Sequence, residues 1–334
     1  MSPPLNAPFF RRILAATGRP EAVDPPLMTA TRLARRQKAR LYIVHAITSA
    51  GIRGDARWPP QNASSSAFKS VPSFPIMARR LVALYGKDFP ELNMEDIRIV
   101  SGVAWEAIFR NACELECHLI VVGPHYESKA ARQLPHAKGP LGSTAEGVLR
   151  HARCPVMMIN RTFQSKQLKM KNIVVGVDFS PSCISALCMT ALISVHFSSQ
   201  VHPFHMLPIP PYPKYSPESL AFDLRRTQAW FDRLCEQLLQ GAEYENRIKT
   251  GVFPHTALLR HARNRHADLI VMGTHTKEKA GKWYPGSVVQ QVSSRADCPV
   301  LVVSGPEALA PWKDDPLAKK IAKSIIPPLT LSPK

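Results

Sequence analysis

The sequence lacks the features that mark several large classes of protein. Across its 334 residues no apolar run approaches the roughly 18–20 residues that a membrane-spanning helix needs. The N-terminus does not carry a basic segment followed by an apolar one, as a secretory signal would. A Gly-x-Ser-x-Gly nucleophile elbow and a Gly-x-x-x-x-Gly-Lys-[Ser/Thr] phosphate loop are also absent. We therefore expect a cytoplasmic protein with no membrane span and without the parts of a fast hydrolase.

Cysteine spacing and charge distribution exclude further classes. The seven cysteines contain no Cys-x-x-Cys pair, and no second pair of Cys or His completes Cys113 and Cys117 as a zinc site. The net charge of +18 gives a general attraction for polyanions, but the basic residues are scattered along the chain. Their densest group, residues 35–40, is expected at a helix end, and no nucleic-acid-binding motif accompanies it. We expect buried, reduced thiols and no specific nucleic-acid partner.

An internal repeat organises the chain. His118–His125 matches Asp268–His275, and Gly142–Ile159 matches Gly286–Val303. A repeat of roughly 150 residues indicates a duplicated domain, because solenoid repeats are only ~20–50 residues long. We therefore divide the chain into domains at 9–160 and 170–305, followed by a basic tail at 306–334.

Each half reads as apolar strands that alternate with helices, a pattern typical of a parallel sheet covered on both faces. The strands expected in the first half are Ile13–Thr17, Leu41–Ile47, Asp96–Ser101, Leu119–Val122 and Val156–Ile159. Those expected in the second half are Ile173–Val177, Val201–Met206, Glu245–Thr250, Leu269–Met272 and Val300–Val303. A long amphipathic helix is expected at Leu220–Gln240. The fold class is therefore α/β.

The second half contains the parts of a nucleotide site. Val177-Asp178-Phe-Ser places a carboxylate at the end of one expected strand. Gly273-Thr-His-Thr276, nine further residues and then Gly286-Ser287 place a glycine-rich turn between another strand and a helix. The first N–H groups of a helix and its dipole attract phosphate. An acidic strand end beside such a turn predicts that a nucleotide binds there.

Both halves resemble domains of the universal stress protein family. The resemblance rests on the five-strand order, the Gly-x-x-Gly-(nine)-Gly-[Ser/Thr] pattern and the Val-Asp-x-Ser motif after the first strand. It implies two doubly wound parallel five-stranded sheets of strand order 3-2-1-4-5, an adenine nucleotide alpha hydrolase-like fold. In such sheets ligands bind at the carboxyl ends of the strands where the order reverses, here between the first and fourth strands. It also implies a role in stress resistance.

The resemblance implies that the second half binds ATP, with or without Mg²⁺. The residues it assigns to this site are Val177, Asp178, Met206, Met272, Gly273, His275, Thr276, Gly286, Ser287 and Val288. Asp178 would meet the adenine or ribose, the two methionines would line the adenine pocket, and the last three residues would hold the phosphates. Thr276 departs from the pattern, because it stands at the second glycine, where a β-branched residue is disfavoured if φ is positive.

The first half departs further from the family pattern. Thr17 takes the place of the carboxylate, with Gly18 following, and Tyr126 replaces the second glycine. Fifteen residues instead of nine then precede Gly142, although Gly142-Ser143-Thr144 keeps the potential to bind an anion. We expect the first half to be a degenerate partner domain.

Several other residues have simpler interpretations than catalysis. His45 and His205, each at a strand end, are expected to be held by backbone hydrogen bonds. Ser180 followed by a proline is typical of a helix N-cap. His255, His261 and His266 are expected on a solvated surface, and His125 and His275 contact either ligand or solvent. The tail is expected to be a flexible end that packs loosely.

Three hypotheses for function follow. The first is a regulatory protein that binds nucleotide without turnover, with its two domains paired through the last strand of each half, and with a homodimer as a further possibility. The second is a slow ATP hydrolase or phosphotransferase that uses Asp178 and Ser287 around Mg²⁺. The third is an interaction module with closed pockets, which Thr276 and Tyr126 favour.

Overall fold

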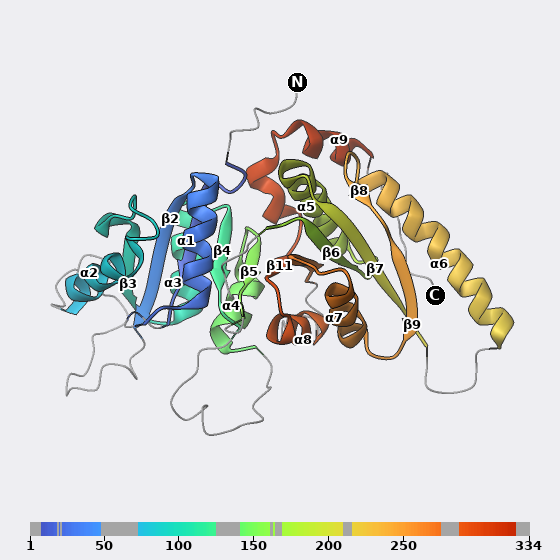
Figure 1. The fold of residues 1–334 in the computed structure, drawn as a ribbon, viewed down its shortest axis with the longest axis horizontal. Coiled ribbons are helices and arrows are strands. Elements are labelled where there is room, and N and C mark those ends of the chain that lie inside the picture. Colours follow the sequence, from blue (N-terminus) through green and yellow to red (C-terminus); the bar gives the residue numbers. More distant parts are fainter. Residues whose placement is uncertain are drawn as a thin grey trace. The chain divides into compact units, whose positions relative to one another are not determined.

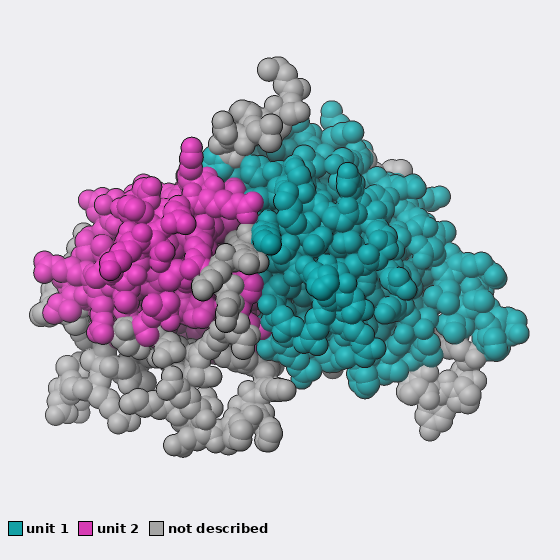
Figure 2. All heavy atoms as spheres, in the orientation of Figure 1, with its two compact units in different colours: residues 1–9, 153–155, 169–334 teal, residues 10–152, 156–168 magenta. Residues whose placement is uncertain are grey.

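The computed structural model describes residues 8–18, 20, 22–47, 73–124, 141–160, 163, 169–209, 216–274 and 287–324. The chain divides into two compact units, shown in different colours in Figure 2. We call residues 10–152 with 156–168 the N-terminal unit, and residues 1–9, 153–155 and 169–334 the C-terminal unit. Over the described ranges, no helix is long and apolar enough to cross a membrane.

The N-terminal unit is built on a parallel sheet of order β3-β2-β1-β4-β5. Its strands are β1 Arg12–Ala16, β2 Arg40–Ile47, β3 Ile97–Ser101, β4 Leu119–Val122 and β5 Val156–Met158. Its helices are α1 Pro25–Gln37, α2 Ser73–Tyr85, α3 Ala104–Glu114 and α4 Ser143–His151. Helix α1 packs on β1, β2 and β4, while α3 packs on α4 and β2 (Figure 1). The strand order 3-2-1-4-5 expected for this half is confirmed.

The C-terminal unit repeats the same layout. Its strands are β6 Asn172–Val177, β7 Gln200–Pro208, β8 Glu243–Tyr244, β9 Arg247–Gly251, β10 Leu269–Gly273 and β11 Val300–Val303. Its principal helices are α5 Pro181–Phe197, α6 Pro217–Leu238, α7 Pro254–Asn264 and α8 Ser287–Arg295. Parallel pairing runs from β7 to β6, β10 and β11, and β8 and β9 both pair with β7. The two halves therefore have equivalent sheets.

Two short strands, β8 and β9, pair with the same strand β7 and are separated by an interruption. The interruption between β8 and β9 lies opposite Pro203, which is part of β7. The carbonyl of Val201 accepts from the N–H of Glu245, so Pro203, two residues later, faces the same side. Proline has no N–H to donate to a ladder. The strand predicted at Glu245–Thr250 is confirmed as β9 from Arg247 onward, whereas Glu245 and Asn246 lie in the interruption.

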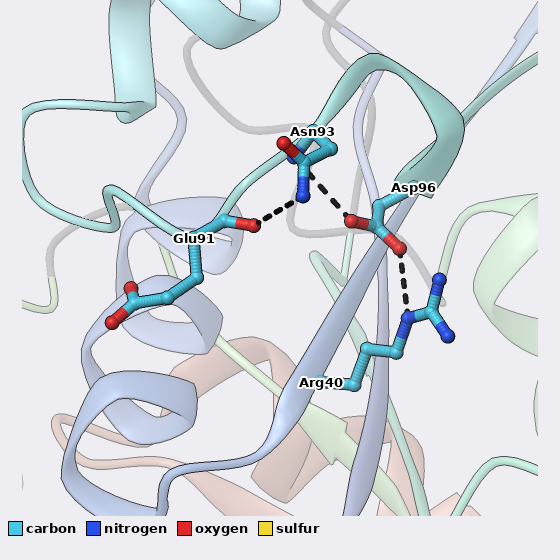
Figure 3. Close-up of polar contacts among 4 residues, drawn as sticks. All are labelled: Arg40, Glu91, Asn93 and Asp96. Atoms are coloured by element: carbon cyan, nitrogen blue, oxygen red, sulfur yellow. Dashed lines mark hydrogen bonds and ion pairs between the residues drawn. The ribbon is translucent and has the colours of Figure 1, made fainter.

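A buried carboxylate links the amino ends of β2 and β3, at the opposite end of these strands from their carboxyl edge. Asp96 is 5% exposed, and its Oδ1 atom accepts from Nε of Arg40 at 2.9 Å (Figure 3). Its Oδ2 atom accepts from the N–H of Asn93 at 3.3 Å, and the Asn93 amide in turn donates to the carbonyl of Glu91. The hydrogen bond to Asp96 raises the pKa of Arg40. These contacts fix the start of the edge strand.

Helix α5 is buried almost all round, which is unusual for a helix that covers one face of a sheet. One side packs on β6 and β10. The other side packs on α6, on the short helix η6 Pro306–Trp312 and on α9 Pro316–Ser324. Trp312 is buried and its ring stacks on Phe9 with centroids 4.9 Å apart.

The C-terminal tail therefore belongs to the C-terminal unit. Ile321 of α9 is buried, as is Ala308 of η6. The expectation of a loosely packed flexible end, which concerned residues 315–326, was wrong for α9, because this helix packs on α5 and buries Ile321. Residues 325–334 lie outside the described residues.

Candidate nucleotide-binding cleft

A cavity of about 370 Å³ lies at the carboxyl ends of the strands in the N-terminal unit. It opens where β1 and β4 meet, the point at which the strand order reverses. Six apolar residues from β1, β2, β4 and α3 line its floor: Ala16, Val44, Ala46, Val122, Ala104 and Ile108. This floor has the character of a surface on which a flat apolar group packs.

Polar groups lie at two parts of the cavity lining. Thr17, Gly18 and Asp24 come from the connection between β1 and α1. Gly142, Ser143 and Thr144 come from the start of α4. Gly142 is the N-cap of α4 and no side chain caps the helix there. The first N–H groups of α4 therefore give the cavity an anion-attracting end.

Asp24 supplies a carboxylate to this cavity. Its Oδ2 atom accepts a hydrogen bond from the Thr17 hydroxyl at 2.9 Å. Its backbone N–H donates to the Tyr85 hydroxyl at 2.8 Å, and Tyr85 is fully buried. Burial raises the pKa of Tyr85 to about 12, so the phenol stays protonated. Asp24 is thus held from two sides.

The helix start explains the position of Asp24. Pro25 and Pro26 occupy the first positions of α1, where proline is favoured, and proline restrains the residue before it from a helical conformation. Asp24 is the N-cap, yet its side chain makes no capping hydrogen bond. Neither proline has an N–H to offer it.

The sequence analysis placed Thr17 at the position equivalent to Asp178, and this assignment was wrong by one residue. Nδ1 of His45 lies 2.8 Å from the carbonyl oxygen of Thr17, and Nδ1 of His205 lies 2.7 Å from that of Val177. Thr17 is therefore equivalent to Val177, and Gly18 stands level with Asp178. The backbone hydrogen bonds expected for the two histidines are confirmed.

In the C-terminal unit Asp178 organises the start of α5. Its Oδ1 atom accepts from the N–H and the hydroxyl of Ser180, at 3.0 and 2.6 Å. Ser180 is the N-cap of α5, as expected, and accepts from the N–H of Cys183 at 3.2 Å. Between them Phe179 has a φ of 60° and packs its ring on His205, with centroids 4.6 Å apart.

Gly273 allows the backbone of α5 to pack closely against the end of β10. A Cβ atom added at this glycine would lie 2.5 Å from the carbonyl carbon of Ser182 and 2.6 Å from the N atom of Cys183. The first turn of α5 therefore packs directly against the end of β10. This approach requires glycine whether or not a phosphate binds nearby.

The remaining residues assigned to the C-terminal unit fall into two groups. Val177, Met206 and Met272 are buried, with Met272 paired in register with Gly176 of β6. Ser287 is exposed at the start of α8, and Val288 follows it half-buried. His275, Thr276 and Gly286 lie outside the described residues, as do His125 and Tyr126. The structure thus brings Val177 and Met272 onto neighbouring strands.

His261 is the clearest error among the other predictions. It was expected on a solvated surface, but it is 3% exposed and its ring stacks on Phe204 with centroids 4.7 Å apart. Burial, with Arg265 and His202 adding to the effect, lowers the pKa of His261 to about 4. His255 is half-buried and His266 is exposed. No group of three or more His, Cys, Asp or Glu in the described ranges is placed to hold a metal ion.

Comparison with known proteins identifies the family to which the chain belongs. The model of the universal stress protein family matches residues 9–160 and 169–304. The chain belongs to the universal stress protein family. It carries two universal stress protein domains, which correspond to the cores of the two units described above.

Individual proteins are similar to this chain in sequence or in structure. A universal stress protein of Methanocaldococcus jannaschii is 26% identical over 156 residues, covering 45% of this chain and 91% of that protein. A universal stress protein of Archaeoglobus fulgidus is similar in structure with a TM-score of 0.56 and 16% identity, covering 89% of this chain and 99% of that one. Another structure from A. fulgidus, 24% identical with a TM-score of 0.31, covers 41% of this chain and 99% of its own; it is a complex with dAMP.

Proposed function

We propose that this chain is a stress-response protein that binds an adenine nucleotide in the cavity of its N-terminal unit. The observation that carries the proposal is that one cleft is lined by apolar residues of the sheet and α3 and by polar groups from two separate segments of the chain. The cleft lies at the strand ends where doubly wound sheets bind ligands. Its volume of about 370 Å³ is within the range of small-molecule sites.

Each part of a nucleotide has a matching part of the cavity. The base would pack on the floor beside Val44, Ala46 and Ile108. The phosphates would lie at the start of α4, where Ser143 adds a hydroxyl to the free N–H groups. The distance between these two parts would be spanned by the sugar.

A second adenine nucleotide, ATP in the first instance, is proposed for the C-terminal unit. The ten residues from Val177 to Val288 named above would hold it, with or without Mg²⁺. Support comes from the pairing of β6 with β10 and from the exposed Ser287 at the start of α8. The close packing of α5 on Gly273 weakens the case for this site relative to the N-terminal one.

We propose that the protein acts by binding an adenine nucleotide and thereby regulating or interacting with other proteins. Hydrolysis of the nucleotide is absent or very slow in this proposal. The alternative is a slow hydrolase or phosphotransferase. Phosphate release from ATP by the purified chain separates the two, since ordinary enzymes turn over at about 1 per second or faster. The predicted pairing of the two units through β5 and β11 stays a prediction, as does a homodimer.

The unit that binds nucleotide can be identified with a matched pair of variants. Ser143→Glu and Ser287→Glu each place a negative charge at the start of one helix, α4 or α8, where it would repel phosphate. Calorimetric titration with ATP should show at least about tenfold weaker binding for Ser143→Glu, a loss of about 1.4 kcal/mol. Binding that is unchanged by Ser143→Glu would contradict the N-terminal site, and unchanged binding in both variants would contradict the proposed function.

A further inference from the structure

The carboxylate of the N-terminal cavity comes from an unexpected element. The residue level with Asp178 is Gly18, which has no side chain to offer. Asp24 enters the same cavity from the start of α1, six residues later in the chain. It is the acidic residue among the cavity-lining residues that the structure describes.

We infer that Asp24 is the residue by which this cavity recognises the hydroxyl groups of its ligand, and that it selects a ribonucleotide over a deoxyribonucleotide. The inference rests on the proposed function and deepens it. An ionised carboxylate has about four acceptor positions on its two oxygens, so it can accept from neighbouring hydroxyl groups of a ligand in addition to the Thr17 hydroxyl. A sugar that joins a base on the floor to phosphates at α4 would present such a pair.

The geometry around Asp24 favours recognition over a purely structural role. An N-cap aspartate ordinarily accepts from the N–H groups of the first helical turn. Here the side chain instead accepts from the hydroxyl of Thr17, another residue of the cavity lining. The positive end of the α1 dipole stabilises the carboxylate as an anion.

Tyr85 acts as a positioning residue for this carboxylate. Its hydroxyl accepts from the N–H of Asp24 and lies 3.5 Å from the carbonyl oxygen of Ala22. Because Tyr85 is fully buried at the end of α2, it fixes the backbone of the connection before α1. The carboxylate therefore meets a ligand with its backbone already ordered, which lowers the entropic cost of recognition.

The test compares three nucleotides on variants of the full chain. Ser287→Glu serves as the background, so that a C-terminal site does not contribute. ATP, 2′-deoxyATP and 3′-deoxyATP are titrated into this background and into its Asp24→Asn derivative, with Asp314→Asn, at an exposed carboxylate outside both sites, as the matched control. We expect ATP to bind about tenfold or more tightly than at least one deoxy analogue, as a hydrogen bond to a charged group predicts.

Asp24→Asn should weaken ATP binding and bring the ratio between ATP and that analogue close to one, while Asp314→Asn leaves the ratio unchanged. Tyr85→Phe should lower the ratio only in part. A merely structural Asp24 would weaken all three nucleotides equally. Such a uniform loss, or a ratio that Asp24→Asn does not alter, would overturn the inference and leave nucleotide binding in place. Absence of binding by all three nucleotides to the unaltered chain would overturn the proposed function together with it.

Discussion

The two units differ most in how the chain passes from the first strand of the sheet to the first helix. In the C-terminal unit three residues separate β6 from α5, which begins at Pro181. In the N-terminal unit α1 begins only at Pro25, and residues 22–24 directly before it are non-helical. Both helices end in a left-handed residue, Lys38 and Ser198, at equivalent positions.

One missing turn of helix therefore distinguishes the two units. The turn that α1 lacks corresponds to the turn of α5 that packs on Gly273. Where this turn is absent, the cavity beside β1 and β4 is open and Asp24 enters its lining. In the half with fewer motif residues, the start of a helix therefore contributes a carboxylate to the lining of the cleft.

The largest expected difference between the two units is the loss of stability that each suffers at low pH. Burial lowers the pKa of His202, His205 and His261 in the C-terminal unit, and that of His118 in the N-terminal unit. A histidine whose pKa is lower in the folded than in the unfolded state stabilises the fold above pH 6.5, and this contribution is lost as the pH falls toward 4. For His261 alone, a pKa of about 4 against an ordinary 6.5 corresponds to about 3 kcal/mol.

Hydrogen exchange of amides in β10 and β4, read between pH 7 and pH 4.5, checks this expectation. The C-terminal amides should lose more protection, after correction for intrinsic exchange rates. His261→Phe keeps the ring stacked on Phe204 and should reduce the pH dependence of β10 alone. Equal losses in the two units would show that the buried histidines do not distinguish them.

Gly273→Ala should lower the free energy of unfolding of the C-terminal unit by about 2 kcal/mol. The added methyl group would meet helix backbone at 2.5–2.6 Å, and overpacking of this kind typically costs about 1–3 kcal/mol. Gly176→Ala is the control, because its methyl group would meet the flexible end of Leu258 at 3.2 Å. Urea denaturation should show the smaller loss for the control; similar losses would contradict the close packing of α5.

Replacing both prolines, Pro25→Ala with Pro26→Ala, should make the N-terminal unit resemble the C-terminal one. Without them α1 is free to extend toward Thr17 and occupy part of the cavity. ATP affinity should then fall about tenfold, which is about 1.4 kcal/mol. Calorimetry measures the affinity, and circular dichroism should show a small gain of helix. Full affinity with a longer helix would show that the missing turn does not create the site.

The smallest effect concerns the two N-caps. Ser180→Ala removes a capping hydrogen bond to Cys183 and should cost about 1 kcal/mol of stability. Asp24→Asn removes no capping bond and should change the stability by less than about 0.5 kcal/mol. Thermal unfolding of both variants checks this difference, and a larger loss for Asp24→Asn would assign Asp24 a mainly structural role.

The sequence was sufficient to predict the fold, because strands that are buried on both faces leave continuous apolar runs. The order 3-2-1-4-5 required the family resemblance. Pro203 was visible in the sequence, but its effect on the neighbouring strand depends on which edge of β7 it faces. That orientation follows from the hydrogen bond between Val201 and Glu245, which are far apart in the sequence, so the residues around Pro203 alone do not reveal it.

The site was harder to predict than the fold. Motif comparison assigned the carboxylate by position along the chain, while Asp24 acts from another element. The signal was present in Pro25-Pro26, which fixes the helix start and makes Asp24 the N-cap. His261 was misassigned because the helix face that turns toward Phe204 depends on how α7 packs. The roles assigned to His275, Thr276 and Gly286 in nucleotide binding stay predictions, because these residues lie outside the described ranges.

The covering of α5 has a consequence for where this domain ends. The family match stops at residue 304, yet η6 and α9 continue beyond it and shield the outer side of α5. A fragment that ends at residue 304 would contain every strand of this half, but the apolar outer side of α5 would be exposed to solvent. We therefore expect that a stable fragment of this half must extend beyond the family match and include Ile321.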